Sequence, residues 1–139
     1  MKYLLDTCVL SELIKKYPNP KVVEWVSKND ESNLFISVLT IGEIHKGIAK
    51  LPESKKKEKL HQWVNYNLKE RFRSRIIDFD LKSATVWGEI QAHSELSGKG
   101  MPAIDGQIAA TGISYDLTVV TRNGTDMEIS GAVLLNPWE

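Results

Sequence analysis

The feature that most constrains the fold is the alternation of short apolar runs with longer stretches of helical periodicity. The short runs have the length and the apolar or β-branched character of buried strands, and the stretches between them repeat apolar residues every three or four positions. Strands that alternate with helices are joined by right-handed crossovers, which give a mainly parallel sheet covered on both faces. We therefore predict an α/β fold with a central, mainly parallel β-sheet flanked by α-helices, whose strands cover residues 3–5, 34–38, 75–79, 117–121 and 132–136.

The helices are expected in the stretches between these strands. Thr40 is expected to open the helix after residues 34–38, and Asp80 is the expected N-cap of a later helix, because side-chain oxygens accept hydrogen bonds from the first free backbone N–H groups. The strongly basic helix that follows Glu53 is expected to have a hinge near Tyr66. The expected helices cover residues 9–14, 22–26, 40–51, 53–71, 80–96 and 103–115.

The length and composition indicate one soluble domain. A chain of 139 residues is long enough for one domain with one core, and no internal repeat, linker or low-complexity segment divides it. No apolar run approaches the roughly eighteen residues of a membrane span, and the N-terminal stretch lacks the features of a signal peptide. The single cysteine, Cys8, has no partner for an internal disulfide, which suits a reducing compartment. We expect a single domain over residues 1–139, located in the cytoplasm and outside any membrane.

The charges are segregated along the chain although the formal net charge is zero. Residues 50–75 hold nine of the 18 basic residues against three acidic ones, whereas residues 101–139 hold Arg122 alone against five acidic residues. Such segregation favours a polyanionic ligand, and the alternative is a solvated helix face whose lysines keep the protein in solution. The basic side chains that we expect to contact a nucleic-acid backbone are Lys50, Lys55, Lys56 and Arg73.

Acidic residues recur at the boundaries between the expected elements. Asp6 follows the first strand, Glu43 lies in the first turns of the helix after the second, Asp105 lies near the start of a helix, and Asp126 follows the fourth strand. Open parallel sheets bind ligands just beyond the carboxyl ends of their strands, which is where these side chains are expected.

Each of these carboxylates also has a purely structural interpretation. Asp6 is a candidate helix cap, and Glu43 stands three residues after Thr40, the spacing of a capping box. Asp105 is placed to favour a helix N-terminus through the helix dipole, and Asp126 is a plausible turn residue. These interpretations remain open for each residue taken singly.

Taken together, the four carboxylates point to a metal ion. Carboxylates gathered at one sheet edge repel one another and raise their own pKa values unless a cation neutralises them. Hard oxygen ligands of this kind favour Mg²⁺ or Mn²⁺, and the chain has no Cys or His residues at the spacing of a zinc site. Such an ion activates water for attack on phosphorus, a remaining carboxylate accepts the proton, and the basic stretch attracts the phosphate backbone.

Several motifs occur along the chain, namely "YLLDTCVLSEL", "TIGEIHKGI", "MPAIDGQIAATG" and "LTVVTRN", followed by a closing "LLNPWE". Together they strongly resemble the PIN-domain ribonucleases, and within them the VapC-type toxins of bacterial toxin–antitoxin pairs. The resemblance covers essentially the whole chain. It implies a PIN fold and a metal-dependent endoribonuclease, the toxin of a type II toxin–antitoxin system. This sequence departs from the family pattern at Asp116, where glycine or asparagine is expected, and at Met127, where such toxins often carry phenylalanine.

The resemblance also implies roles for individual residues. Asp6, Glu43 and Asp105 match the family's first three acidic ligands and catalytic positions, and Asp126 matches a fourth, more variable one. The polar positions that line the same pocket and hold water or a carboxylate in place are matched by Thr121 and Asn123.

The resemblance implies partners as well as a substrate. Besides RNA, these are a small antitoxin of the VapB type and a second copy of the chain in a homodimer. The helix residues that are candidates for a partner groove, with core packing as their alternative role, are Trp25, Ile48, Leu51 and Trp63. Glu12, on the first helix, is expected to pair with Lys16 at i+4 and not to bind the metal.

Two other functions are compatible with an aspartate after the first strand. One is a catalytically inactive, PIN-like binding module in which the acidic pocket is residual. The other is a phosphoaspartyl phosphatase or receiver-like domain, but the phosphatase requires a second aspartate two residues on, and Cys8 stands there.

Overall fold

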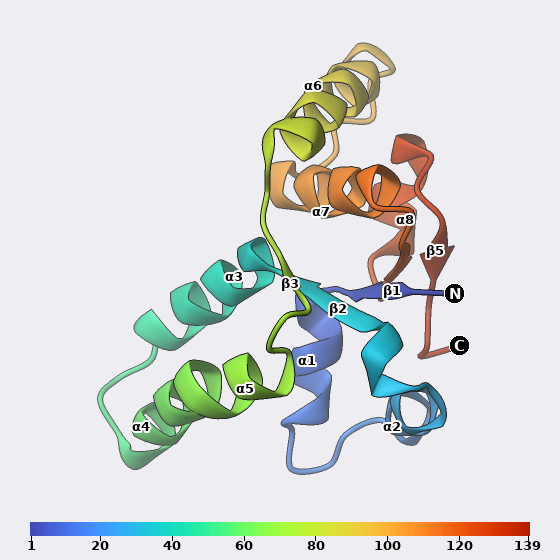
Figure 1. Cartoon of the computed structure of the whole chain (residues 1–139). Coiled ribbons are helices and arrows are strands. Elements are labelled where there is room, and N and C mark those ends of the chain that lie inside the picture. Colours follow the sequence, from blue (N-terminus) through green and yellow to red (C-terminus); the bar gives the residue numbers. More distant parts are fainter.

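The computed structural model describes residues 1–139, and its five strands form one sheet in the order β3-β2-β1-β4-β5 (Figure 1). Every pair of neighbouring strands is parallel. The predicted α/β fold with a parallel sheet is therefore confirmed. In chain order the elements are β1 (Tyr3–Leu5), α1 (Thr7–Leu13), α2 (Pro20–Lys28), the 3-10 turn η1 (Glu31–Asn33), β2 (Leu34–Ser37), α3 (Val38–Ala49), α4 (Lys55–Gln62), the π-helical segment η2 (Trp63–Leu68), α5 (Lys69–Arg71), β3 (Ile76–Ile77), α6 (Leu81–Leu96), α7 (Ala103–Ser114), β4 (Thr118–Val120), α8 (Gly124–Met127), the 3-10 turn η3 (Glu128–Ser130) and β5 (Leu134–Leu135).

Several predicted boundaries differ from the structure, among them the start of the helix after β2 and the extent of β3. The helix after β2 begins at Val38 and not at Thr40, because the Ser37 side chain accepts a hydrogen bond from the backbone N–H of Leu39 and acts as the N-cap. Only Ile76 and Ile77 pair with the sheet in the stretch predicted as the third strand. Asp80 is the N-cap of α6, as predicted, and accepts from the backbone N–H of Ser83.

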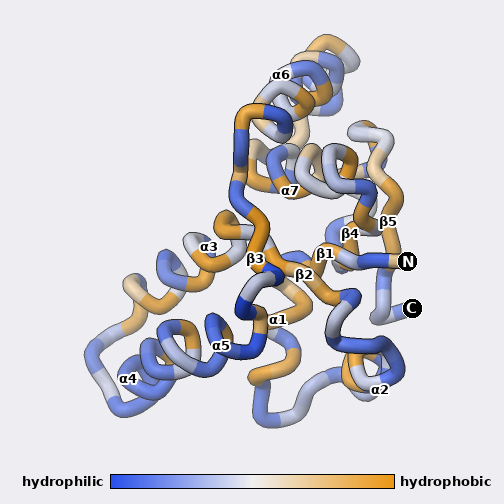
Figure 2. Tube along the Cα trace, in the orientation of Figure 1, coloured by the Kyte–Doolittle hydropathy of each residue, from blue (hydrophilic) through white to orange (hydrophobic).

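The long basic helix runs from α4 through η2 into α5. Its predicted irregularity near Tyr66 falls in the π-helical segment η2, where the backbone winds more loosely than in an α-helix. In Figure 1, α3 extends away from the sheet and α4 and α5 return beneath it, so that this arm flanks α1. Figure 2 shows that α4 and α5 are mostly hydrophilic, whereas the strands are hydrophobic.

The core lies on both faces of the sheet, because successive strand residues point to opposite sides. Leu5 belongs to the larger cluster, which joins α1, α2, α3 and η2 to one face of the sheet, and Leu4 belongs to the smaller cluster, which joins α7 to the other face. Both leucines are almost completely buried. β1 is thus held between two layers of helices, and the residue that follows it is fixed in place. None of the helices combines the length and the apolar character that crossing a membrane requires.

The packing of α7 against β4 depends on one glycine. A Cβ atom on Gly112 would lie 2.7 Å from Cγ2 of Val119 and 3.1 Å from the carbonyl oxygen of Leu117, so only glycine allows this close approach. The turn that follows has Asp116 in the left-handed region at φ 55°, which explains why glycine or asparagine is expected there. This contact fixes α7, whose first turn carries Asp105.

Candidate metal centre at the carboxyl edge of the sheet

The candidate site lies at the carboxyl edge, by which we mean the edge where the parallel strands end. β2 and β3 lie on one side of β1, and β4 and β5 lie on the other, so the strand order reverses between β1 and β4. Ligands bind at such switch points in open α/β sheets. Asp6 follows β1 and Thr121 follows β4, and the Thr121 hydroxyl donates a 2.8 Å hydrogen bond to Oδ2 of Asp6.

Asp6 is buried, with an exposed fraction of 3%, and both of its carboxylate oxygens accept hydrogen bonds. Oδ1 accepts from the backbone N–H of Thr7 at 2.8 Å, and Oδ2 accepts from the hydroxyl of Thr121. Burial raises the pKa of Asp6 above its usual value, and these hydrogen bonds partly offset that effect. Asp6 therefore caps α1, as its structural interpretation proposed, and also faces the carboxyl edge.

Glu43 is linked to Asp6 through Thr7, which bonds to both residues. The Thr7 hydroxyl donates a 2.6 Å hydrogen bond to Oε1 of Glu43 and lies 3.3 Å from the hydroxyl of Thr40. The capping-box interpretation of Glu43 is wrong, because Ser37 caps α3 and Glu43 lies in the second turn of that helix. The side chain instead reaches across to the start of α1.

Asp105 lies within electrostatic range of the three other carboxylates. Its pKa is raised to about 6, first by burial and then by the negative charges of Asp6, Asp126 and Glu43. A carboxylate that served only to favour a helix N-terminus would have a lowered pKa, because the helix dipole stabilises its charged form. Asp105 lies in the first turn of α7, so the dipole is present, but burial and like charge outweigh it. We call Asp6, Glu43, Asp105 and Asp126 the acidic cluster.

The turn after β4 connects Asp126 to the rest of the cluster. Asn123 donates its backbone N–H to the Thr121 hydroxyl at 2.9 Å, and its carbonyl oxygen accepts from the backbone N–H of Asp126 at 3.1 Å. Asp126 itself is exposed and lies in the short helix α8. Thr121 and Asn123 thus lie beside the acidic cluster, and Thr121 contacts Asp6 directly.

Sequence reasoning missed three residues that organise this site, namely Thr7, Cys8 and Thr40. The signal for the first two was their position directly after Asp6, in the first turn of α1. The Cys8 sulfur lies 3.8 Å from Oδ2 of Asp6 and 3.7 Å from the Thr121 hydroxyl. Burial and then the Asp6 charge raise the pKa of the Cys8 thiol, so the thiol is neutral in this setting.

The basic residues expected to contact RNA lie away from the acidic cluster. Lys50 caps the far end of α3, seven residues or about 10 Å along the axis from Glu43. Lys55 and Lys56 are in the first turn of α4, and Arg73 follows α5 and forms an exposed ion pair with Glu70. None of them bonds to an acidic-cluster side chain, so their role in binding RNA stays a prediction.

The donor set of the acidic cluster fits a hard divalent cation. Its side chains offer only carboxylate oxygens, which are the ligands that Mg²⁺ and Mn²⁺ prefer, and Asp105 carries the raised pKa of a carboxylate among like charges. No three His, Cys, Asp or Glu side chains are close enough together to hold a metal ion as they stand. Binding therefore requires side-chain rotation, and the metal-ligand role of these residues stays a prediction.

Comparison with known proteins agrees with the fold and the motifs. Residues 3–128 match the family described as PIN domain. Toxin FitB of Neisseria gonorrhoeae is 35% identical over 135 residues, which cover 97% of each chain. VapC ribonuclease Y4jK of Sinorhizobium fredii is 31% identical over 136 residues, which cover 98% of this chain and 97% of the relative. The crystal structure of FitAcB from Neisseria gonorrhoeae has a TM-score of 0.93 at 34% identity and covers 99% of both chains.

The chain therefore belongs to the PIN-domain family. Its relatives at 30% identity or more, over nearly the whole length of both chains, include proteins named as VapC-type ribonucleases and as a toxin. The resemblance seen in the sequence motifs is thus confirmed at the level of the family and of its VapC-type branch.

Replacing Asp105 with asparagine should stabilise the metal-free protein at alkaline pH. The folded state raises the pKa of Asp105 from 3.8 to about 6, so its ionised form costs stability above pH 6, and the cost disappears as the pH falls toward 4. In the presence of a chelator, Asp105→Asn is expected to raise the free energy of unfolding at pH 8 by about 1 kcal/mol, the pKa shift being discounted for partial exposure.

The measurement is urea unfolding followed by circular dichroism at pH 4.5, 6 and 8. The gain should be largest at pH 8 and should shrink at pH 4.5. Asp116→Asn, an equivalent change at the opposite edge of the sheet, should show no such pH-dependent gain. A loss of stability in Asp105→Asn at pH 8 would contradict the raised pKa of Asp105 described above.

Proposed function

We propose that this protein is the toxin of a type II toxin–antitoxin system and an endoribonuclease that cleaves RNA phosphodiester bonds in the cytoplasm with a divalent cation, Mg²⁺ or Mn²⁺. The observation that carries the proposal is the acidic cluster, in which three other carboxylates act on the pKa of Asp105. An arrangement of like charges that costs stability is expected to be retained for a function that needs it. The VapC-type relatives support the choice of RNA as substrate.

The residues proposed to hold the cation are Asp6, Glu43, Asp105 and Asp126. When bound, the cation lowers the pKa of a water molecule and offsets the charge of the phosphate under attack. Two threonines set the orientation of the first two carboxylates: the Thr121 hydroxyl holds Oδ2 of Asp6, and the Thr7 hydroxyl holds Oε1 of Glu43. Partners of this kind commonly change metal affinity or activity by about 10- to 100-fold. A carboxylate oxygen of the cluster left free is proposed to accept the proton of the attacking water.

Purified protein is expected to cleave RNA with Mg²⁺ or Mn²⁺, and chelator should stop the reaction. Asp6→Asn and Asp105→Asn each remove a negative donor oxygen, so each should lower the cleavage rate by at least about 100-fold. The assay is sequencing of the RNA ends that form in total bacterial RNA, combined with circular dichroism to verify folding.

Asp116→Asn is the matched control, because it makes the same chemical change at an exposed position on the opposite edge of the sheet. It should cleave like the parent. Folded Asp6→Asn and Asp105→Asn variants that cleave as fast as the parent would contradict the proposal and would favour the inactive binding module.

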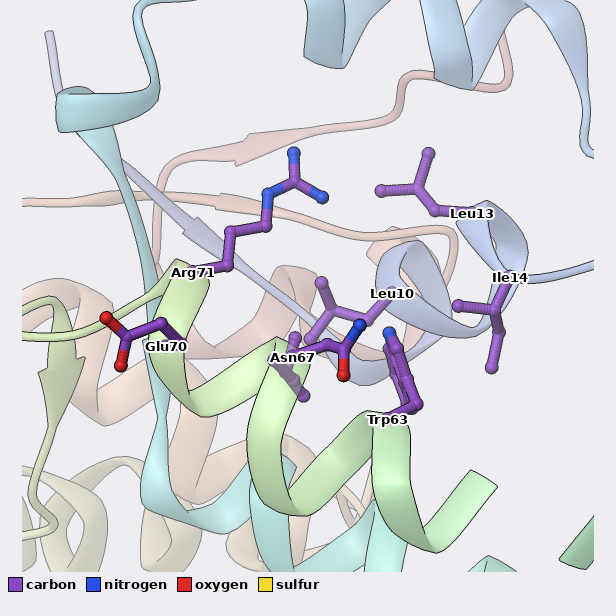
Figure 3. A pocket seen from close by; sticks show the side chains of 8 residues that line it. Leu10, Leu13, Ile14, Trp63, Asn67, Glu70 and Arg71 are labelled. Atoms are coloured by element: carbon purple, nitrogen blue, oxygen red, sulfur yellow. The ribbon is translucent and has the colours of Figure 1, made fainter. Parts of the chain in front are cut away.

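A groove beside α1 is the proposed docking surface for the antitoxin. Its apolar floor is made by Leu10, Leu13 and Ile14 of α1 and the turn after it, opposite Trp63 of η2, and the groove has a volume of about 510 Å³. Figure 3 shows these side chains lining one pocket. Of the residues considered for a partner groove, Trp63 and Leu51 line this region, whereas Ile48 is buried and Trp25 packs edge-on against Tyr3. We name the surface defined by Leu10, Leu13, Ile14 and Trp63 the α1 groove.

Glu70 and Arg71 both line the α1 groove, and the lysines in the hollow beside it favour an acidic partner segment. Next to Ile14, the groove continues into a hollow lined by Lys15, Lys16, Lys56 and Lys59. An apolar floor with a lysine rim fits an antitoxin segment that presents apolar side chains and carboxylates. The lysine stretch of α4, which the sequence assigned to RNA, is thereby proposed to serve antitoxin recognition as well.

Ile14→Glu is expected to weaken antitoxin binding by at least about 100-fold, because it places a charge in the apolar floor, while RNA cleavage stays at the parent level. Isothermal titration with the antitoxin encoded beside the gene measures this. Ile14 is 42% exposed, and Ile113, 39% exposed at the far edge of the sheet, provides the control Ile113→Glu. Equal binding by both variants would exclude the α1 groove.

Light scattering on the free toxin should give twice the chain mass of 15.7 kDa, as the proposed homodimer requires.

A further inference from the structure

The proposed function leaves one basic residue at the carboxyl edge unexplained. Arg122 is the only lysine or arginine among residues 101–139, and it lies between Thr121 and Asn123, which both belong to the turn beside the acidic cluster. It is exposed and forms no ion pair with any carboxylate. An arginine next to several carboxylates normally pairs with one of them. Something in the fold must therefore keep its side chain apart from them.

The closing segment of the chain holds the Arg122 side chain. The guanidinium carbon lies 5.3 Å from the ring centroid of Trp138, within the range of a cation–π contact. Trp138 is fixed in turn, because its ring packs against the larger core cluster and its backbone N–H donates to Oδ1 of Asn136 at 2.9 Å. The "NPWE" ending thus has a structural role beside the candidate site.

Glu12 lies near Trp138 and is itself held by other partners. This residue is buried on α1, one turn after Cys8, and it pairs with Lys15 and not with Lys16 as predicted. Hydrogen bonds from the Lys15 ammonium, the Asn19 backbone N–H and the Trp138 indole hold the pKa of Glu12 below its usual value. The Glu12 carboxylate is therefore already occupied, chiefly by Lys15 and Asn19, and is not a free partner for Arg122.

The backbone of Arg122 is fixed to the acidic cluster itself. Its N–H donates to the Cys8 sulfur at 3.4 Å, and that sulfur lies 3.8 Å from Oδ2 of Asp6. The main chain of Arg122 is thus tied to the start of α1 while its side chain rests on Trp138. The positive charge stays beside the cluster without neutralising it, and the N–H groups at the rim of the guanidinium remain free to bind an anion.

We propose that Arg122 binds a backbone phosphate of the RNA adjacent to the one that is cleaved, and that Trp138 is a positioning residue that holds its side chain off the acidic cluster. The inference rests on the proposed ribonuclease function and assigns a substrate contact to it. RNA brings several phosphates to an edge that already carries four carboxylates, so a fixed cation there offsets repulsion that the metal alone does not remove. The planar guanidinium presents paired N–H groups that match phosphate oxygens.

The test is steady-state cleavage of an oligoribonucleotide that spans a cut site mapped with the parent protein. Arg122→Gln should raise KM by about tenfold and change kcat by less than about threefold, since the lost contact is made equally before and during the reaction. It should also reduce the slope of log(kcat/KM) against log salt concentration by about 0.7, the value for one phosphate contact to a single strand.

Lys2→Gln is the matched control. Lys2 also carries its charge over an aromatic ring, that of Phe35 at 5.6 Å, but it precedes β1 and so lies at the opposite edge of the sheet. The substitution removes the same charge and should leave both KM and the salt slope at the parent values.

Trp138→Leu tests the positioning role, because it keeps the charge but removes the aromatic face. Alone it should raise KM several-fold, and in the Arg122→Gln background it should have no further effect, which a merely structural role of Trp138 would not produce. If Trp138→Leu does not fold, the comparison of Arg122→Gln with Lys2→Gln still decides the phosphate contact.

The outcomes separate this inference from the function on which it rests. A parent protein that cleaves no RNA contradicts both. A parent that cleaves RNA, with an Arg122→Gln variant that matches Lys2→Gln in KM and salt slope, contradicts the Arg122 contact and leaves the ribonuclease function standing.

Discussion

The burial of Asp105 beside three other carboxylates at the carboxyl edge is the constraint on which the arrangement of this protein depends. Burial first, and then the negative charges of Asp6, Asp126 and Glu43, raise the pKa of Asp105 to about 6, so its ionised form costs stability whenever no cation is present. The rest of the fold has to hold these carboxylates together in spite of that cost. β1 does this by lying between two apolar clusters, one on each face of the sheet, so Asp6 cannot move away from its neighbours without disturbing the core.

Hydrogen bonds from neutral side chains set the positions of the carboxylates without neutralising them. Thr121 bonds to Asp6, and Thr7 bonds to Glu43, while the only nearby arginine, Arg122, rests on Trp138. A cationic partner in either place would lower the charge of the cluster and compete with a metal ion. The structure therefore combines neutral donors close to the carboxylates with a positive charge held a short distance away.

Much of this could be predicted from the sequence, because local patterns determine it. The alternation of strands and helices predicted the parallel sheet, and the position of four carboxylates at element boundaries predicted the acidic cluster. The capping-box interpretation of Glu43 failed because Ser37, the last residue of β2, caps α3 before Thr40 is reached. The pairing of Glu12 with Lys15 was missed because α1 ends at Leu13, so both lysines lie beyond the helix and helical spacing does not decide which of them reaches Glu12.

Contacts between residues far apart in the chain could not be predicted from local sequence patterns. Arg122 and Trp138 meet only because β4 and β5 are neighbours and both end at the carboxyl edge. The basic stretch had the right composition for RNA binding, but the arm formed by α3, α4 and α5 carries it away from Asp6 and Asp105, which sequence distance does not reveal. Placement in the fold, and not charge alone, decides which basic residue lies beside the candidate site.

The most direct test of the central claim is a crystal structure of the protein soaked in Mn²⁺, with anomalous scattering used to locate the metal. The account predicts at least one Mn²⁺ bound to carboxylate oxygens of Asp6 and Asp105, with Glu43 or Asp126 rotated toward it. Ordered acidic-cluster side chains with no anomalous peak among them at saturating Mn²⁺ would contradict the assignment of this edge as a metal centre.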